Sequence, residues 1–236
     1  MTSPAIKLFL DGAEIQQIRQ AVQENPMVKG FTTNPTLMRK AGITDYAAFA
    51  KEALETVNGL PISFEVFSDD FESMEREARI IAGWGGGANV KIPITNTKGE
   101  SSAPLIARLS RDGIMINATA IMTLDQVRLV AEALSPETPA IVSVFAGRVA
   151  DTGRDPIPHM QECLEILKSR PKAELLWASP REALNIYQAA AIGCHIITAT
   201  ADQIAKLKLR DKDLDEYSLE TVKMFYKDAT AAGYRL

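Results

Sequence analysis

The chain has 236 residues and a mass of 25.8 kDa; 46% of the residues are hydrophobic and 24% are charged. This composition excludes intrinsic disorder, because enough apolar surface is available for burial. Its two cysteines are too few for a disulfide scaffold, and no apolar run approaches the roughly 20 residues that span a bilayer. A formal net charge of -4 argues against nucleic acid as a partner. We therefore expect a cytoplasmic protein with no membrane segment.

Short apolar runs recur along the chain, and helical patterns lie between them. The runs are rich in Ile, Val, Phe and Thr, and their near-continuous apolarity is typical of parallel strands covered on both faces. They lie at residues 6–12, 28–34, 62–68, 89–95, 114–120, 140–147, 174–179 and 195–200. The length fits two small domains or one barrel. Because eight strand–helix units follow one another without a linker, we predict an α/β fold with a single (β/α)8 TIM barrel over residues 1–236.

The predicted helices carry start signals of their own. They lie at residues 45–57, 70–84, 124–134 and 180–192, and Asp70, Thr123 and Pro180 stand where N-cap or first-turn residues belong. The glycine-rich segment 83–89 is expected to end a helix and turn into the fourth strand. A last amphipathic pattern at about 218–234 predicts an extra C-terminal helix.

Lys91 is the most unusual residue of the predicted strands, because it interrupts an apolar run. Side chains alternate along a strand, so Val90 and Ile92 share one face and Lys91 takes the other. If Val90 and Ile92 face the helices, the lysine points into the barrel. Burial disfavours a charged amine, and a neutral amine is a nucleophile toward carbonyl groups. A structural lysine paired with a carboxylate is an equally good interpretation.

Polar residues lie within or at the end of most other predicted strands. Active sites of such barrels lie at the carboxyl ends of the strands. The candidates are Asp11, Thr33, Asn34, Glu65, Asn117, Thr119, Ser143 and Ser179, with Phe145 on the same face as Ser143. Any one of them could be a satisfied core residue, and for Thr33 or Ser143 alone this is the better interpretation. Their joint placement favours one central cavity.

A group of arginines follows the sixth and seventh strands. Arg148 and Arg154 come after the sixth strand, and Arg181 lies two residues after Ser179. Arginine forks, a serine hydroxyl and a helix N-terminus together form an anion site. Surface ion pairs are the alternative, which is the better interpretation for Arg154 and an even one for the other two. The two histidines lack the spacing of a zinc motif, and we expect no metal and no cofactor.

Several segments resemble the transaldolase family, and the chain length matches its small-subunit branch, which includes the fructose-6-phosphate aldolases. GFTTNPTL (30–37) is close to the family signature (G/A)VTTNPSL, and NVKIPIT (89–95) is similar to the segment that carries the Schiff-base lysine. FLDGA, INATAIMT, VSVFAGRVAD and WASPREAL are similar to further family segments. The matches run in order from the first to the seventh strand and cover almost the whole chain.

The resemblance implies a metal-free class I aldol mechanism. Lys91 would form the Schiff base with a ketose donor, and Asp11 would act in proton transfer during carbon–carbon cleavage. Glu65, with a water held by Thr119, would relay protons for imine formation and hydrolysis. The iminium withdraws electrons from the breaking bond, so cleavage would leave a stabilised enamine.

The resemblance also implies which residues hold the substrate. Asn34 and Asn117 would bind donor hydroxyls and hold the lysine, and Ser143 would contact the dihydroxyacetone unit. The terminal phosphate would be held by Arg148, Ser179 and Arg181. Thr33 and Phe145 complete the expected substrate-binding set.

Two positions indicate which branch the chemistry follows. The fructose-6-phosphate aldolases usually have Gln and Tyr where this chain has Glu65 and Phe145, whereas transaldolases have Glu and Phe. The resemblance therefore implies transfer of a dihydroxyacetone unit from a ketose phosphate to an aldose phosphate. Release of free dihydroxyacetone by a lyase is the alternative, and a non-catalytic barrel that binds sugar phosphates is a third.

The departures from the family pattern concern the anion-binding part. Pro180 replaces the usual Phe, and Arg154 is an additional arginine without an assigned role. They leave open whether the terminal anion is a phosphate or, for example, a sulfonate. We expect sugar phosphates as partners, neither nucleic acid nor membranes, and a homo-oligomer between a dimer and a decamer. The segment 218–234 would pack either on a neighbouring subunit or on its own barrel.

Overall fold

In the computed structural model, which describes residues 6–236, eight parallel strands form a closed barrel. The strands are β1 (Lys7–Asp11), β2 (Val28–Thr32), β3 (Ile62–Glu65), β4 (Ala88–Pro93), β5 (Ile116–Ile121), β6 (Ala140–Val144), β7 (Ala173–Trp177) and β8 (Ile196–Ala199). Each strand pairs with its neighbour in sequence, and β8 pairs with β1. The predicted (β/α)8 barrel is confirmed.

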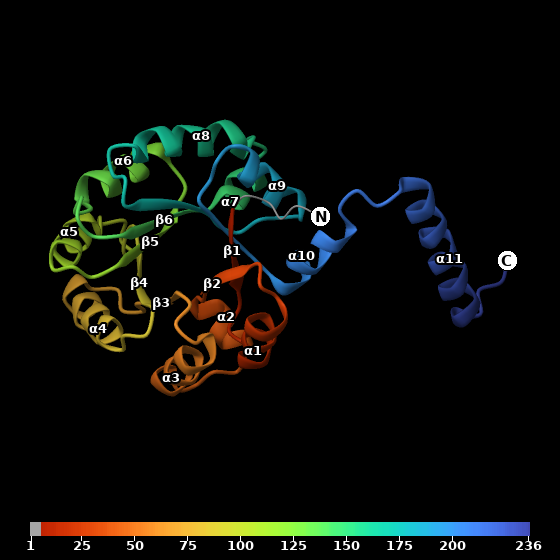
Figure 1. Cartoon of the computed structure of the whole chain (residues 1–236), viewed down its shortest axis with the longest axis horizontal. Coiled ribbons are helices and arrows are strands. Elements are labelled where there is room, and N and C mark those ends of the chain that lie inside the picture. Colours follow the sequence, from red (N-terminus) through yellow and green to blue (C-terminus); the bar gives the residue numbers. More distant parts are fainter. Residues whose placement is uncertain (1–5) are drawn as a thin grey trace. The chain divides into compact units, whose positions relative to one another are not determined.

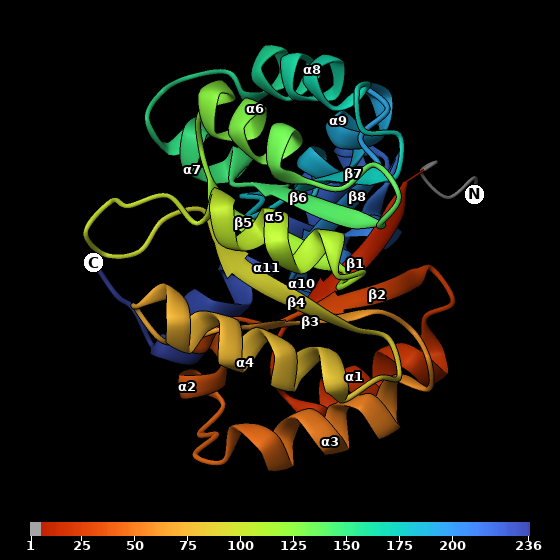
Figure 2. The same cartoon turned by 90° about the vertical axis from the view of Figure 1, so that its left-hand side faces the viewer.

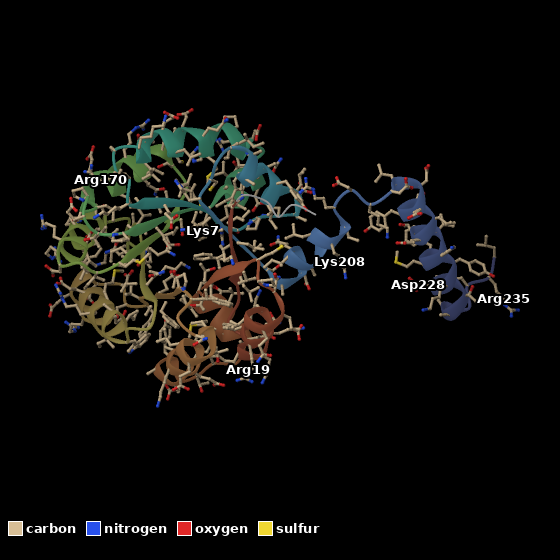
Figure 3. All side chains as sticks on the ribbon, viewed as in Figure 1. Lys7, Arg19, Arg170, Lys208, Asp228 and Arg235 are labelled. Carbon is tan, nitrogen blue, oxygen red and sulfur yellow. The ribbon has the colours of Figure 1, made fainter. Side chains whose placement is uncertain are left out.

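Helices surround the barrel, as Figure 1 shows. They are α1 (Ile15–Glu24), α2 (Pro35–Lys40), α3 (Tyr46–Val57), α4 (Phe71–Gly83), α5 (Ala103–Arg111), α6 (Leu124–Ala133), α7 (Ala146–Asp151), α8 (Pro156–Leu167) and α9 (Leu184–Ala191). After β8 the chain continues with α10 (Ala201–Ala205), the 3-10 helix η1 (Lys206–Leu209) and α11 (Leu214–Ala232). In the view of Figure 2, α4, α5, α6 and α8 lie along the outside of the strands. Figure 3 shows the side chains of Arg19 and Arg170 at the outer surface of the barrel.

The N-caps predicted for two helices are present. The Asp70 carboxylate accepts a hydrogen bond from the Ser73 amide at the start of α4. Thr123 and Gln126 form a reciprocal capping box at the start of α6. Each cap satisfies backbone N–H groups that have no partner within the helix.

The helix predicted from Pro180 begins only at Leu184. Ser179 has a φ of 60°, which lies in the left-handed region and turns the chain away from a helix. The backbone N–H groups of Arg181 and Glu182 then both donate to the Asn185 side-chain oxygen, at 2.7 and 3.2 Å. These contacts hold the segment as a turn beside the end of β7.

The outer and inner faces of the strands differ in character. Val90 and Ile92 are fully buried, whereas Lys91 takes the opposite face, as the alternation predicts. On the inner face, an apolar cluster fills part of the barrel: Phe9, Ile141, Leu176, Ala178 and Ile196. Gly30 is required there, because a Cβ at this position would lie 2.6 Å from the Phe9 ring. The polar inner-face residues are therefore concentrated toward the carboxyl ends of the strands.

The chain divides into two compact units, one that extends to Ile204 and a second that comprises Ala205–Leu236. In the second unit, α11 begins four residues before the predicted helix, because Asp213 caps it by accepting a hydrogen bond from the Glu216 amide. None of the side chains of α11 is buried. Within residues 6–236, no helix combines the length and the apolar character needed to cross a membrane.

Candidate active site

A cavity of about 550 Å³ lies at the carboxyl ends of the barrel strands. The predicted residues that border it are Asp11, Asn34, Glu65, Lys91, Thr119, Ser143, Phe145, Arg148 and Ser179. Three predicted residues do not border it, namely Thr33, Asn117 and Arg181. The barrel thus gathers most of the polar strand-end residues around one space.

Lys91 projects from β4 into this cavity and is only 6% exposed. Its Nζ lies 2.9 Å from Glu65 Oε2, and it donates a hydrogen bond of 2.9 Å to the backbone oxygen of Thr33. Glu65 and Lys91 are register partners on β3 and β4, which places the carboxylate beside the amine. The carboxylate and the carbonyl together hold the amine in a fixed position.

Asp11, at the end of β1, is tied to a pair of threonines. The Thr32 hydroxyl donates to Asp11 Oδ1 at 2.7 Å and lies 2.5 Å from the Thr198 hydroxyl. Because Thr32 has a single hydroxyl proton, Thr198 is the donor to Thr32. Burial raises the pKa of Asp11, while the Lys91 charge and the Thr32 hydrogen bond act in the opposite direction. A carboxyl group of this kind is suited to exchanging a proton with a substrate.

A chain of hydrogen bonds links three strands inside the barrel. Ser143 Oγ donates to Asn117 Oδ1 at 2.7 Å, and Asn117 Nδ2 donates to Ser63 Oγ at 2.9 Å. Asn117 is fully buried and fixes the position of Ser143, which borders the cavity. Ser63 was not predicted, although it shares the inner face of β3 with Glu65 and the two-residue alternation could have revealed it.

Thr119 borders the cavity where β5 departs from regular pairing. The register with β6 shifts between Ala118 and Ile121, and Ala120 has a φ of 60°. Irregularities of this kind re-aim side chains next to active sites. The hydroxyl of Thr119 is buried and has no hydrogen-bond partner among the described residues. Thr119 therefore places a hydroxyl without a protein partner at the wall of the cavity.

Asn34 and Thr33 lie side by side after β2 but differ in role. Asn34 Oδ1 accepts a hydrogen bond of 3.0 Å from the Leu37 amide and caps α2, while the residue borders the cavity. The Thr33 hydroxyl donates to the Ser63 backbone oxygen at 2.9 Å and is fully buried. The backbone oxygen of Thr33 thus accepts the hydrogen bond from the Lys91 amine, whereas its side chain links β2 to β3.

Arg148 and Ser179 border the cavity at its cationic end. The Arg148 guanidinium lies 5.7 Å from the centre of the Phe145 ring, an arrangement that orients the arginine. Gly147 lets α7 approach the turn after β7, because a Cβ there would lie 1.6 Å from the Ser179 backbone oxygen.

Arg181, which follows β7, is bound to a carboxylate at the end of α7. Its guanidinium forms two hydrogen bonds with the Asp151 carboxylate, at 2.7 and 2.5 Å, and donates to Ser179 Oγ at 2.9 Å. The Arg181 hydrogen bonds hold the pKa of Asp151 below its usual range. Arg181 therefore positions Ser179 and does not border the cavity itself.

Two further residues were missed by sequence reasoning. Lys40, in the last turn of α2, borders the cavity. Tyr46 donates its hydroxyl to the backbone oxygen of Glu65 at 2.8 Å, and burial raises the pKa of this hydroxyl. Both lie on helices, α2 and α3, so the alternation of strand residues gives no sign of them.

The fold and the cavity together define a (β/α)8 barrel with a buried lysine and two carboxyl groups at the carboxyl ends of its strands. Within residues 6–236, no three His, Cys, Asp or Glu side chains converge to form a metal site. A sequence profile described as transaldolase/fructose-6-phosphate aldolase matches residues 8–236. The chain belongs to this family.

Individual relatives agree with the family profile. A protein named probable transaldolase from Thermoanaerobacter sp. (strain X514) is 35% identical over 90% of this chain and 95% of the relative. A protein of the same name from Thermoplasma volcanium is 35% identical over 89% of this chain and 91% of the relative. These findings support a transaldolase-type enzyme.

A solved structure from Burkholderia cenocepacia, provisionally assigned as a lyase/mutase, superimposes with a TM-score of 0.59. It is 14% identical and covers 89% of this chain and 85% of its own. At this identity the likeness concerns the barrel fold alone.

Proposed function

We propose that this chain is a transaldolase that forms a Schiff base through Lys91 and moves a dihydroxyacetone unit from a ketose phosphate to an aldose phosphate. The observation that carries the proposal is the position of the Lys91 amine, which is buried at the cavity 2.9 Å from Glu65 Oε2. A neutral amine at this place reaches a carbonyl group that enters from the open end.

The first step joins the donor to the enzyme. The Lys91 amine adds to the ketone carbon, the oxygen leaves as water, and an iminium ion remains. Glu65 accepts the proton that the attacking amine releases and returns a proton to the departing oxygen, because it lies within hydrogen-bond distance of Nζ. The unpartnered hydroxyl of Thr119 would hold the water that takes part in this exchange.

The second step breaks and remakes a carbon–carbon bond. Asp11 removes the proton from the hydroxyl of the fourth carbon, the bond between the third and fourth carbons breaks, and its electron pair moves to the iminium to give an enamine. The first aldose leaves, and the enamine carbon attacks the aldehyde of the acceptor while Asp11 returns the proton. The raised pKa of Asp11 suits both directions of this transfer.

The terminal anion of donor and acceptor would be held by Arg148 and Ser179, which border the cavity. Arg148 has no carboxylate partner among the described residues, so its guanidinium is available to a phosphate. Arg181 would act indirectly, by fixing Ser179. A sulfonate in place of the phosphate remains an alternative, because both anions present oxygens to the same donors.

A lyase that releases free dihydroxyacetone is the second candidate. It uses the same lysine and differs only in protonating the enamine in the absence of an acceptor. Phe145 favours the transferase, because its ring has no hydroxyl that could deliver this proton to the enamine. A non-catalytic sugar-phosphate-binding barrel is less well supported, since a binding protein has no need of a buried amine beside two carboxyl groups.

We also propose that copies of this chain associate through α11. Its apolar residues Leu219, Val222, Phe225 and Tyr226 are all more than half exposed, at 52%, 59%, 62% and 75%. Their helical spacing places them on one side of α11, and exposed apolar stripes of this kind mark association surfaces.

Reductive trapping tests the catalytic proposal. The protein is incubated with fructose 6-phosphate and sodium borohydride, digested, and mapped by mass spectrometry. We expect one adduct, on Lys91, and no adduct in Lys91→Met. The matched control is Lys40→Met, which removes the other lysine at the cavity and should keep the adduct. Absence of any adduct, or an adduct on Lys40, would overturn both enzymatic readings.

A further inference from the structure

A second pocket of about 550 Å³ lies beside the catalytic cavity, at the start of α6 and along α7 and the loop that follows it. Its apolar lining comes from Met122, Leu124 and Val149. Arg128, Arg148 and Arg154 also line it, together with the carboxylate of Asp125, so mainly cationic groups border an apolar surface. Arg148 borders both the catalytic cavity and this pocket.

The three arginines of this pocket differ in whether they form an ion pair with a carboxylate. Arg128 pairs with Asp125 at 2.6 Å. Arg148 and Arg154 form no ion pair with any carboxylate of residues 6–236. Asp151 lies close enough to Arg148 to interact with it electrostatically but forms its ion pair with Arg181. Two guanidinium groups without an ion pair at one pocket give it a positive potential, which attracts anions.

The acidic residues nearest to Arg154 in sequence are engaged elsewhere. Asp151 is held by two hydrogen bonds from Arg181. Asp155 caps α8 by accepting a hydrogen bond of 2.9 Å from the Ile157 amide. Asp151 and Asp155 are close to Arg154 in sequence, but each is bonded to another group and neither forms an ion pair with Arg154.

Arg154 is also held in place. Its Nη1 donates to Thr152 Oγ1 at 2.6 Å, and the Thr152 hydroxyl donates to the Val149 backbone oxygen at 2.7 Å. A surface arginine normally loses side-chain entropy when it binds a ligand, and a tethered guanidinium loses less. The tether leaves the remaining N–H groups of the fork free to donate.

We propose that this pocket is a second anion site, which binds a phosphate monoester through Arg154 and Arg148 while Met122, Leu124 and Val149 cover the carbon skeleton. A phosphate offers several acceptor oxygens to two guanidinium forks, and the apolar lining suits the carbon side of a small phosphorylated molecule. The site shares Arg148 with the catalytic cavity but does not involve Lys91, and it assigns a role to Arg154.

Calorimetric titration of the full chain with inorganic phosphate tests the proposal. We expect two binding events per chain, one in each cavity. Arg154→Gln should weaken one event about tenfold, as expected for the loss of one charge-assisted hydrogen bond, and leave the other unchanged. Arg148→Gln should weaken both. The control is Arg76→Gln, which removes the same charge from α4 and should bind as the wild type does.

Competition identifies where the phosphate comes from. If one molecule of fructose 1,6-bisphosphate displaces both phosphates, the pocket receives the second anionic end of a ligand in the catalytic cavity. If it displaces one, the pocket receives a separate phosphate monoester; both results support the site. A single binding event with equal affinity in the wild type, Arg154→Gln and Arg76→Gln overturns it, whatever the outcome of the borohydride experiment.

Discussion

Glu65 and Lys91 are register partners on the neighbouring strands β3 and β4, and Lys91 Nζ lies 2.9 Å from Glu65 Oε2. Both side chains border the cavity. This pair couples the charge of the amine to that of the carboxyl group. On its own such a contact is an ion pair; in the proposed reaction the same contact would carry protons between the amine and the carboxyl group.

Replacement of Glu65 by Gln keeps the size of the side chain but removes the proton acceptor. We expect the rate of Schiff-base formation to fall roughly 100-fold, in line with the loss of a general acid–base group. Single-turnover trapping with borohydride measures this rate directly. Glu100→Gln, which changes a carboxylate outside the cavity, should leave the rate unchanged. Equal rates in Glu65→Gln and the wild type would remove Glu65 from the proposed relay.

Glu65→Gln combined with Phe145→Tyr should shift the balance of products. The added hydroxyl provides a proton donor for the enamine, so release of free dihydroxyacetone should rise relative to transfer to an aldose acceptor. The measurement is the ratio of the two products with and without erythrose 4-phosphate, compared with each single variant. An unchanged ratio in the double variant would count against the assignment to the transferase branch.

Replacement of Thr32 by Val removes the hydroxyl that donates to Asp11. This hydrogen bond stabilises the carboxylate, and its loss should raise the pKa of Asp11 further above its usual range. Asp11 must be ionised to accept the hydroxyl proton, so the acidic limb of the kcat profile should move to higher pH. Thr198→Val, which leaves the Thr32–Asp11 contact intact, should move it less. A shift to lower pH would contradict the assigned role of Asp11.

Gly147→Ala should disturb the anion end of the cavity. The new methyl group would lie 1.6 Å from the Ser179 backbone oxygen, so α7 or the turn after β7 must move. We expect a loss of stability of about 1–3 kcal/mol, as for other overpacked sites, and a higher KM for the sugar phosphate. Gly83→Ala is the matched control, because nothing lies within 4 Å of its Cβ position in α4. Similar melting temperatures for the two variants would show that the contact is not tight.

Two glutamines on the apolar side of α11 should weaken self-association. Val222→Gln with Phe225→Gln removes two exposed apolar side chains, whereas Lys223→Gln with Lys227→Gln makes two equivalent changes on its polar side. We expect a lower mass by light scattering only for the first pair. A wild-type chain that is monomeric at all concentrations would overturn the proposed association.

The strand pattern allowed most of the predicted strand-end residues that border the cavity to be identified from the sequence. Alternation places Lys91 opposite Val90 and Ile92 on β4, and the closed barrel brings strand-end residues such as Asp11 and Glu65 to one cavity. These features depend on local periodicity and on the general geometry of barrels, which the sequence carries directly.

The hydrogen-bond partners of individual side chains could not be predicted in the same way. Arg181 was expected to hold a phosphate, but Asp151, thirty residues earlier, engages its guanidinium. Thr33 was expected at the substrate, and its hydroxyl instead bonds to the backbone of Ser63. Such pairings depend on side chains from different loops, whose relative positions are set only by the folded barrel.

The hydrogen-bond chain through Asn117 has a direction. Ser143 gives its only hydroxyl proton to Asn117 Oδ1, so toward the cavity it presents lone pairs alone. A ligand hydroxyl can donate to Ser143, whereas a carbonyl oxygen at the same place would meet a second acceptor and be repelled. If the proposed donor binds here, the serine would receive one of its hydroxyl groups and exclude its carbonyl oxygen, which would orient the donor before any covalent bond forms.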